Sequence, residues 1–330
     1  MIEENLKKGC VIDTRDPRDI EYRQVMGAPK PFDWVAGFDV EKHLGITIKI
    51  KDQSQSESCV GQGNSYLAAT VNAGITGVYD EISAKAIYSQ IFIPNGGGAQ
   101  IRDGVALTTT FGELLEKIVS SHKSDGSVDE AFMEDTSWIT AAIVIMAKNL
   151  ITKSYASVMT YTMEAWAQAI RDNNGVVAGV TGNNNNSWLT NEPQPPLMTT
   201  PQNQLWGHCL FFGKAGTDSL GKYISTPNSW GTRTKDSLHP DGWQKLRQNW
   251  FDNNARFLFN PWTLVDKIQK PMTNKLLKDS ASSACGYWTP AVNEAALIVQ
   301  AKADGITLPL LSNGGINWSL VKIDGTIKLN

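Results

Sequence analysis

The spacing of apolar and polar residues predicts both helices and strands along the chain. Helical spacing is clearest shortly after residue 59, where Leu67, Ala68, Ala69 and Val71 lie in one run. Further helices are predicted at residues 82–90, 102–111, 125–150 and 163–170. Continuous or alternating apolar runs predict strands at residues 46–50, 176–180 and 205–213. The pattern therefore predicts a mixed helix and strand protein with a buried core.

One long segment between these elements shows neither spacing. Residues 183–201 begin with four consecutive asparagines and contain four prolines, so we expect an irregular loop. Trp188 lies in this loop, and Trp206 follows it closely. Long loops in compact domains are often functional, and we expect these tryptophans to shape substrate pockets.

The residues after 260 carry folding signals of their own. Thr289-Pro290 starts a predicted helix over about 290–303, and Gly305 ends it. Residues 316–329 then predict a hairpin with a two-residue turn at Asp324-Gly325. The C-terminal part is therefore expected to be an ordered module.

Length, composition and charge narrow the class of protein. At 330 residues the chain has room for two lobes plus an extension. Apolar residues make up 41% and charged residues 19%, as in ordinary globular proteins. A net charge of −3 and a pI near 5.9 argue against a nucleic-acid partner held by basic charge.

No signal for export or membrane insertion is predicted. The first nine residues are charged and lack an apolar stretch. The most apolar run, residues 138–147, is about half the length that spans a bilayer. The cysteines, at positions 10, 59, 209 and 285, are too widely spread for a metal knuckle. We therefore expect a cytoplasmic protein with no membrane partner, no metal and no other cofactor.

The first candidate for chemistry is Cys59, six residues after Gln53. Cys59 directly precedes the predicted central helix, and a helix N-terminus favours thiolate over thiol. The amide of Gln53 is placed to donate to an oxyanion beside that sulfur. Taken alone, however, a free cysteine is more often a small buried apolar residue.

Two later segments supply the partners that a nucleophilic cysteine needs. His208 begins a buried apolar run, and Asn228 lies in the segment Pro227-Asn-Ser-Trp-Gly231. A cysteine nucleophile, a distant histidine base and an asparagine that orients the base occur in this order in papain-like enzymes.

From about Pro29 to about Phe259 the chain resembles the papain-like cysteine peptidases. The resemblance implies that Cys59, His208, Asn228 and Gln53 are the catalytic residues. It places the tryptophan that covers the histidine–asparagine pair at Trp230. It places the glycine-rich segment that lines the substrate groove at Asn95, Gly96 and Gly97. Together with Trp206, which follows the long loop, and Trp230, these are the candidate substrate-binding residues.

The chain also departs from the family pattern. The usual Cys-Gly-Ser-Cys-Trp reads Ser56-Glu-Ser-Cys-Val60 here. The family's disulfide partners fall on Ser56 and Pro94, so that bridge cannot form. Residues 1–28, which we call the lead, are too short for a large inhibitory pro-domain, and we expect them to wrap the body or occupy the groove. These features are more typical of microbial or viral members than of lysosomal ones.

The resemblance implies an α+β fold with two lobes and an active site in the cleft between them. The peptidase body is expected over residues 29–260, after the lead and before an extension over 261–330. The helical lobe is expected over about 59–165, and the antiparallel β-barrel lobe over about 29–55 and 170–260.

The implied activity is hydrolysis of peptide bonds in a peptide or protein substrate. Acyl transfer and deamidation use the same residues and stay open as alternatives. A further alternative is a non-catalytic papain-like body that binds peptides or that residues 261–330 dock to a larger assembly. If that assembly were viral, the protein would be associated with the virion.

Because the family's bridge positions are Ser56 and Pro94, the native chain is expected to contain no disulfide. Thiol titration of the denatured, unreduced protein should return four free thiols per chain. A count of two would contradict this prediction and the reducing compartment with it.

Overall fold

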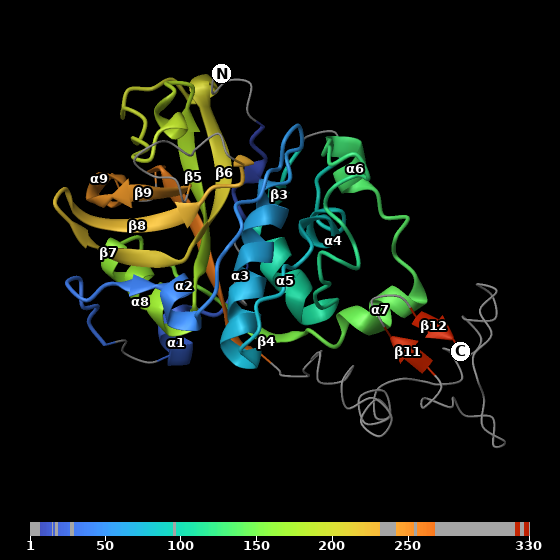
Figure 1. The fold of residues 1–330 in the computed structure, drawn as a ribbon. Coiled ribbons are helices and arrows are strands. Elements are labelled where there is room, and N and C mark those ends of the chain that lie inside the picture. The colour runs from blue at the N-terminus through green and yellow to red at the C-terminus, as the bar shows by residue number, and fades with distance from the viewer. Residues whose placement is uncertain are drawn as a thin grey trace.

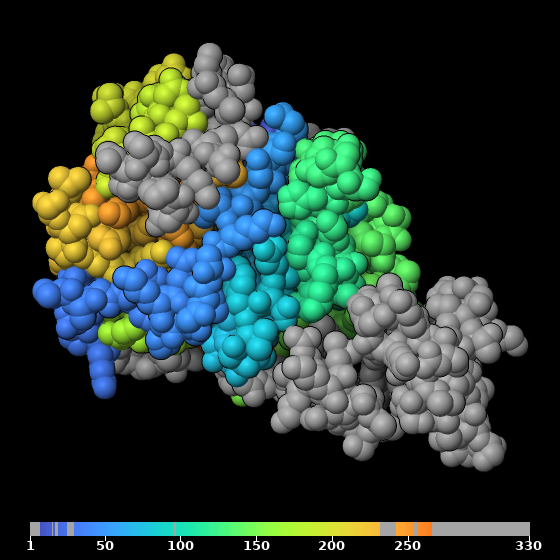
Figure 2. Space-filling view, in the orientation of Figure 1, coloured from blue at the N-terminus to red at the C-terminus, as the bar shows by residue number. Residues whose placement is uncertain are grey.

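The computed structural model describes residues 7–14, 16, 19–26, 30–94, 97–231, 242–253, 256–267, 321–323 and 327–329. Figure 1 shows helix α3 in the middle of the molecule, with most of the strands on one side of it and helices α4 to α7 on the other. In the space-filling view, the chain that precedes α3, in blue, lies between the yellow and orange sheet side and the green helical side (Figure 2).

The described helices are mostly short. They are α1 (Tyr22–Met26), α2 (Val40–Leu44), α3 (Cys59–Thr76), α4 (Ala84–Tyr88), α5 (Ile101–Thr110), α6 (Glu130–Glu134), α7 (Ala141–Ala147), α8 (Met163–Asn173) and α9 (Gln248–Asp252). Within the described ranges, none of them has the length and apolar character to cross a membrane.

The strands form two four-stranded antiparallel sheets and two small pairs. The first sheet has the order β4 (Thr152–Ser157), β10 (Leu258–Lys267), β5 (Val176–Asn183) and β6 (Leu205–Phe212). The second has the order β2 (Phe38–Asp39), β7 (Lys214–Asp218), β8 (Gly221–Pro227) and β9 (Trp243–Arg247). The pairs are β1 (Cys10–Val11) with β3 (Ala99–Gln100), and β11 (Val321–Ile323) with β12 (Ile327–Leu329). Helices and antiparallel sheets together confirm the predicted α+β class.

Helix α3 is buried along most of its length. All residues from Cys59 to Ala73 are buried, and Gly77 ends the helix in the left-handed conformation that glycine favours. Its packing against β6 is close because Gly63 has no side chain. A Cβ there would lie 2.8 Å from Cys209 Sγ and 3.0 Å from a Val177 methyl. This contact sets the distance between the start of α3 and the strand that carries His208.

A second core lies around α8 and the sheets. Thr162 caps α8 by accepting a hydrogen bond from the backbone of Ala165. Trp166 and Ile170 point into a buried cluster that also contains Phe212 and Trp250. This core holds β6 and β8, the strands that lead to the candidate site.

Two predictions from the apolar pattern were wrong in detail. Residues 46–50 do not form a strand, because Glu41 binds this segment: its carbonyl accepts from Ile46 N–H and its carboxylate from Ile48 N–H. The predicted helical region at 125–150 contains two short helices, α6 and α7, joined by a non-helical segment.

The last body strand crosses the position where we expected the body to end. Strand β10 continues past residue 260 and pairs with β4 as far as Lys267 with Thr152. The same pairing places β4, residues 152–157, in the first sheet, whereas we expected these residues to belong to the helical lobe.

The C-terminal hairpin is described only through its two strands. β11 and β12 pair antiparallel, with Ile323 opposite Ile327. The turn predicted at Asp324-Gly325 lies outside the described residues. The helix predicted at 290–303 lies outside the described residues.

The close contact at Gly63 predicts that replacing this glycine by alanine lowers the stability of the protein, the opposite of the usual effect in a helix. Alanine normally stabilises a helix relative to glycine by about 1 kcal/mol. Here the added methyl must displace Cys209 and Val177, so Gly63→Ala should destabilise the protein by about 1–3 kcal/mol. Urea unfolding monitored by tryptophan fluorescence measures this difference. Equal or higher stability would show that α3 does not need this close approach.

Candidate active site

Cys59 is the first residue of α3 and is fully buried. Burial raises the pKa of its thiol, and the backbone groups of Cys209, Gly9 and Val60, which lie near the sulfur, oppose this larger effect. Cys209 directly follows His208 on β6, so the thiol lies beside the strand that carries the candidate base. The structure thus brings the two predicted segments together at the start of the central helix.

A backbone contact joins the glutamine loop to the asparagine turn. Gln53 N–H donates to Ser229 O at 2.8 Å, and Gly231 N–H donates to Lys51 O at 2.9 Å. The Gln53 side chain is also fixed, because its Oε1 accepts from Ser229 Oγ at 2.7 Å. These bonds place Gln53 next to the turn that carries Asn228 and Trp230.

His208 contacts Asn228 directly. His208 Nε2 lies 2.9 Å from Asn228 Oδ1, and both side chains are fully buried. The ring of Trp230 stacks on the imidazole with centroids 4.7 Å apart and an interplanar angle of 27°. The other ring nitrogen, Nδ1, is buried and makes no hydrogen bond to any described residue. The geometry therefore fixes one side of the imidazole and leaves the other open for a proton.

Three tryptophans surround this pair. Trp188 contacts the rings of His208 and Trp230 edge-on, and Trp206 does the same. Trp206 itself is held by a hydrogen bond from its indole to Asn184 Oδ1. The long asparagine-rich loop thus supplies part of the shell that keeps water from the imidazole.

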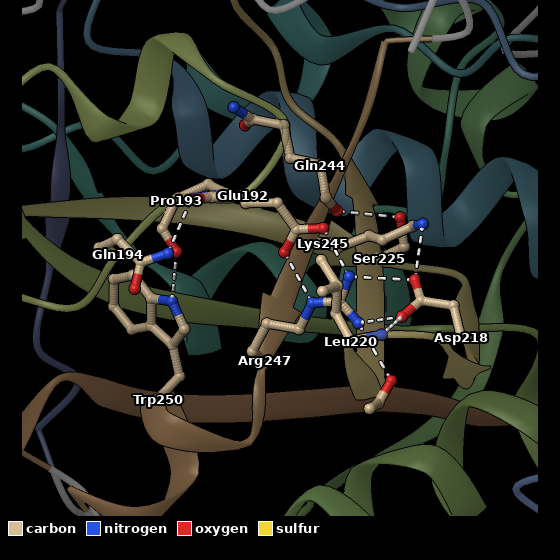
Figure 3. Close-up of polar contacts among 11 residues, drawn as sticks. Glu192, Pro193, Gln194, Asp218, Leu220, Ser225, Gln244, Lys245, Arg247 and Trp250 are labelled. Carbon is tan, nitrogen blue, oxygen red and sulfur yellow. Dashed lines mark hydrogen bonds and ion pairs between the residues drawn. The ribbon is translucent and has the colours of Figure 1, made fainter. Parts of the chain in front are cut away.

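Arg247 holds the asparagine-rich loop in place through Glu192. Figure 3 shows its guanidinium between Glu192 and Asp218, with hydrogen bonds of 2.6 and 2.7 Å to Glu192 and of 2.7 and 3.0 Å to Asp218. The indole of Trp250 adds a bond to Pro193 O at 2.9 Å. Arg247 also lowers the pKa of the Asp218 carboxyl well below its ordinary value.

The lead lies across Cys59. Gln53 Nε2 donates to Lys7 O at 2.9 Å, and β1 pairs in parallel with β3 beside the glycine-rich segment. The fit is close, because a Cβ on Gly9 would lie 2.1 Å from Glu57 O. Nearby, Lys7 Nζ lies 3.8 Å from Glu57, and Lys8 Nζ lies 5.0 Å from the centroid of the Trp206 ring. We expected the lead either to wrap the body or to occupy the groove. The structure shows its residues 7–10 in front of Cys59.

Burial beneath the lead changes the protonation states that we expect for Cys59 and His208. The sequence predicted a thiolate, but burial raises the pKa of the Cys59 thiol well above its ordinary value, and nearby Cys10 adds to the shift. Burial also lowers the pKa of His208 to about 4, although the Asn228 contact opposes this. At neutral pH the described state therefore holds a neutral thiol beside a neutral imidazole, because exclusion of water disfavours both charged forms.

The candidate substrate-binding residues are only partly visible. Gly97 has a φ of +68°, and a Cβ there would collide with the carboxylate of Glu57. Asn95 and Gly96 lie outside the described residues. Trp206 and Trp230 both lie at the histidine, as described above.

Sequence reasoning missed several residues that support the site. Gln244 is fully buried and contacts Asn228, and Lys7, Gly9 and Cys10 lie over the thiol. Nothing in the local sequence identifies Gln244, since it is one polar position in a strand. Gly9-Cys10 carries a weak signal, because a glycine beside a cysteine permits close approach of the backbone. The described cysteines, Cys10, Cys59 and Cys209, are free thiols, and Cys285 lies outside the described residues.

Comparison with solved structures places this geometry in a known fold. No protein-family model matches the sequence, and no curated protein sequence matches it significantly. The structure is similar to xylellain, a cysteine protease from Xylella fastidiosa, with a TM-score of 0.61 and 17% identity over 79% of this chain and 96% of that one.

Two further similarities come from other kingdoms. Digestive procathepsin L 3 of Tenebrio molitor has a TM-score of 0.55 and 15% identity, over 79% of this chain and 76% of that one. Bromelain from Ananas comosus, solved with the inhibitor E64, has a TM-score of 0.50 and 14% identity, over 74% of this chain and 100% of that one. The described body of this protein, in which Cys59 opens the central helix and His208 lies on the adjoining sheet, therefore has the fold of the papain-like cysteine proteases.

Proposed function

We propose that this protein is a cysteine peptidase that hydrolyses peptide bonds in peptide or protein substrates. The observation that supports the proposal is the His208–Asn228 contact, which lies in a papain-like fold beside the Gln53 loop and on the strand next to Cys59 at the start of α3. These groups come from three segments that are far apart in the sequence. A protein that only binds peptides does not need a nucleophile, a base and an oxyanion donor in one place.

The reaction begins with proton transfer from the Cys59 thiol to His208 Nδ1. The sulfur then attacks the substrate carbonyl carbon, and the carbonyl electron pair moves to oxygen. Collapse of this intermediate breaks the C–N bond, and the proton on His208 passes to the leaving amine. Water, deprotonated by His208, next attacks the thioester and releases the acid and the Cys59 thiol.

Gln53 and Asn228 act on different groups in this sequence. Gln53 Nε2 points to the position of the Lys7 carbonyl, where a substrate oxyanion would accept its hydrogen bond together with the Cys59 backbone N–H. Asn228 Oδ1 accepts from His208 Nε2, which fixes the ring and leaves Nδ1 as the nitrogen that can take the thiol proton. Trp230 protects that bond from water.

The lead must move before a substrate can react. Cys59 has no exposed surface, and the Lys7 carbonyl occupies the Gln53 donor. Departure of residues 7–11 would rehydrate the thiol and imidazole, which removes the burial that disfavours their charged forms. The described state is accordingly the resting form of the proposed enzyme.

The oxyanion role of Gln53 gives the first test of the activity. Gln53→Ala should lower kcat by about 100- to 1,000-fold with little change in KM, as expected when a transition-state donor is lost. Fluorogenic peptides cleaved by the full chain provide the assay, and Cys59→Ala sets the background. Hydrolysis that persists in Cys59→Ala would contradict the proposed peptidase.

The position of the lead gives a second prediction. Gly9→Ala adds a methyl that collides with Glu57 O, so the lead should leave Cys59 more often. Overpacking of this kind costs about 1–3 kcal/mol, which corresponds to roughly a 5- to 150-fold faster alkylation of Cys59 by iodoacetamide. Peptide mapping by mass spectrometry measures the rate at Cys59. An unchanged Cys59 rate would show that the lead does not control access.

A further inference from the structure

We propose that Gln244 is a positioning residue that selects the reactive tautomer of His208 through Asn228. The proposal rests on the proposed function, because it concerns which imidazole nitrogen is free to take the proton of Cys59. Three buried amide and imidazole groups form the chain of contacts: Gln244, Asn228 and His208.

The series of hydrogen bonds starts at the backbone carbonyls of Trp188 and Thr190, which can only accept. Gln244 Nε2 lies 2.8 Å from Trp188 O and 2.6 Å from Thr190 O. Backbone carbonyls have no proton to give, so the NH₂ end of Gln244 must face them. The amide oxygen of Gln244 then has only one direction in which to point, toward Asn228.

The direction of each later bond follows from the first. Gln244 Oε1 lies 2.8 Å from Asn228 Nδ2 and accepts its hydrogen bond. Asn228 Oδ1 is thereby turned to His208 Nε2, which must carry a proton in order to donate to it. A flipped Asn228 would place its oxygen against Gln244 Oε1 and leave two buried acceptors in contact without a proton, which is unfavourable.

At His208, the last group in this series of hydrogen bonds, the nitrogen that must accept the thiol proton is left free to do so. With the proton on Nε2, the neutral imidazole has its lone pair on Nδ1, and Nδ1 is the buried atom that makes no hydrogen bond to any described residue. Asparagine alone cannot impose this choice, because its side chain offers a donor or an acceptor according to how it is turned. The backbone carbonyls of Trp188 and Thr190 therefore determine the tautomer of His208 through two side chains, Gln244 and Asn228.

The test uses the full chain labelled with ¹⁵N-histidine, and long-range ¹H–¹⁵N NMR spectra that distinguish the two tautomers. His208→Gln identifies the signals of His208. At neutral pH the wild type should show His208 protonated at Nε2. Protonation at Nδ1 in the wild type would overturn the proposal, whatever the variants do.

Two substitutions of similar length separate positioning from packing. Gln244→Met neither donates nor accepts, so Asn228 should turn freely and His208 should show a mixture of tautomers. The carboxyl group introduced by Gln244→Glu is buried, so it should be protonated. Its O–H can donate to the Thr190 carbonyl while its other oxygen accepts from Asn228 Nδ2, so this variant should retain the Nε2–H form. If both variants shift the tautomer equally, or neither does, Gln244 supports the site only by filling space. Gln90→Met, at a half-buried glutamine in the turn that follows α4, controls for loss of an amide.

Kinetics provide an independent readout. Gln244→Met should lower kcat by about tenfold or more, because general-base catalysis is lost from molecules with the wrong tautomer. Gln244→Glu should recover most of that loss. Absence of peptide hydrolysis in every variant would contradict the proposed function while leaving the tautomer result to decide this proposal. Thermal unfolding curves confirm that each variant is folded.

Discussion

The structure of the site depends on one buried hydrogen bond, from His208 Nε2 to Asn228 Oδ1. It links the two sheets, because His208 lies on β6 and Asn228 directly follows β8. Its strength depends on exclusion of water, and Trp230 and Trp188 provide that exclusion from two sides. The ion pairs of Arg247 hold the loop that carries Trp188. Elements more than forty residues apart thus cooperate to hold one imidazole ring.

Burial has opposite effects on structure and on reactivity here. The same exclusion of water that strengthens the imidazole contact disfavours the charged forms of Cys59 and His208. A site built this way is stable while covered and becomes chemically competent only when it is opened. The lead covers Cys59 through backbone groups at Lys7 and Gly9. Its described residues are also held by side chains farther along, because Asp16 and Asp19 bind Arg102 and Asp13 accepts from Trp262.

The sequence was informative where residue type is dictated by chemistry. Gln53, Cys59, His208 and Asn228 were identifiable as candidates because a nucleophile, a base and their hydrogen-bond partners permit few substitutes. The structure shows the His208–Asn228 contact and the bond between the Gln53 loop and the turn that carries Asn228. The central helix followed from its apolar run. The α+β class and the papain-like fold followed from the resemblance.

Features that depend on tertiary contacts were not predictable in this way. The strand expected at 46–50 is absent because the side chain and carbonyl of Glu41 take up its backbone groups. The thiolate expected at Cys59 depends on solvent, and only the fold reveals that Gly9 lies over the sulfur. Gln244 could not be found because its role arises from the direction of its hydrogen bonds and not from its residue type.

The position of β10 has a consequence for how the chain is made. This strand lies between β4 and β5, although it follows both by about a hundred residues or fewer in the sequence. During synthesis from the N-terminus, β4 and β5 therefore emerge long before their shared neighbour and expose unpaired edges to other chains. Lys267 must leave the ribosome before the four-stranded sheet that carries His208 can be completed.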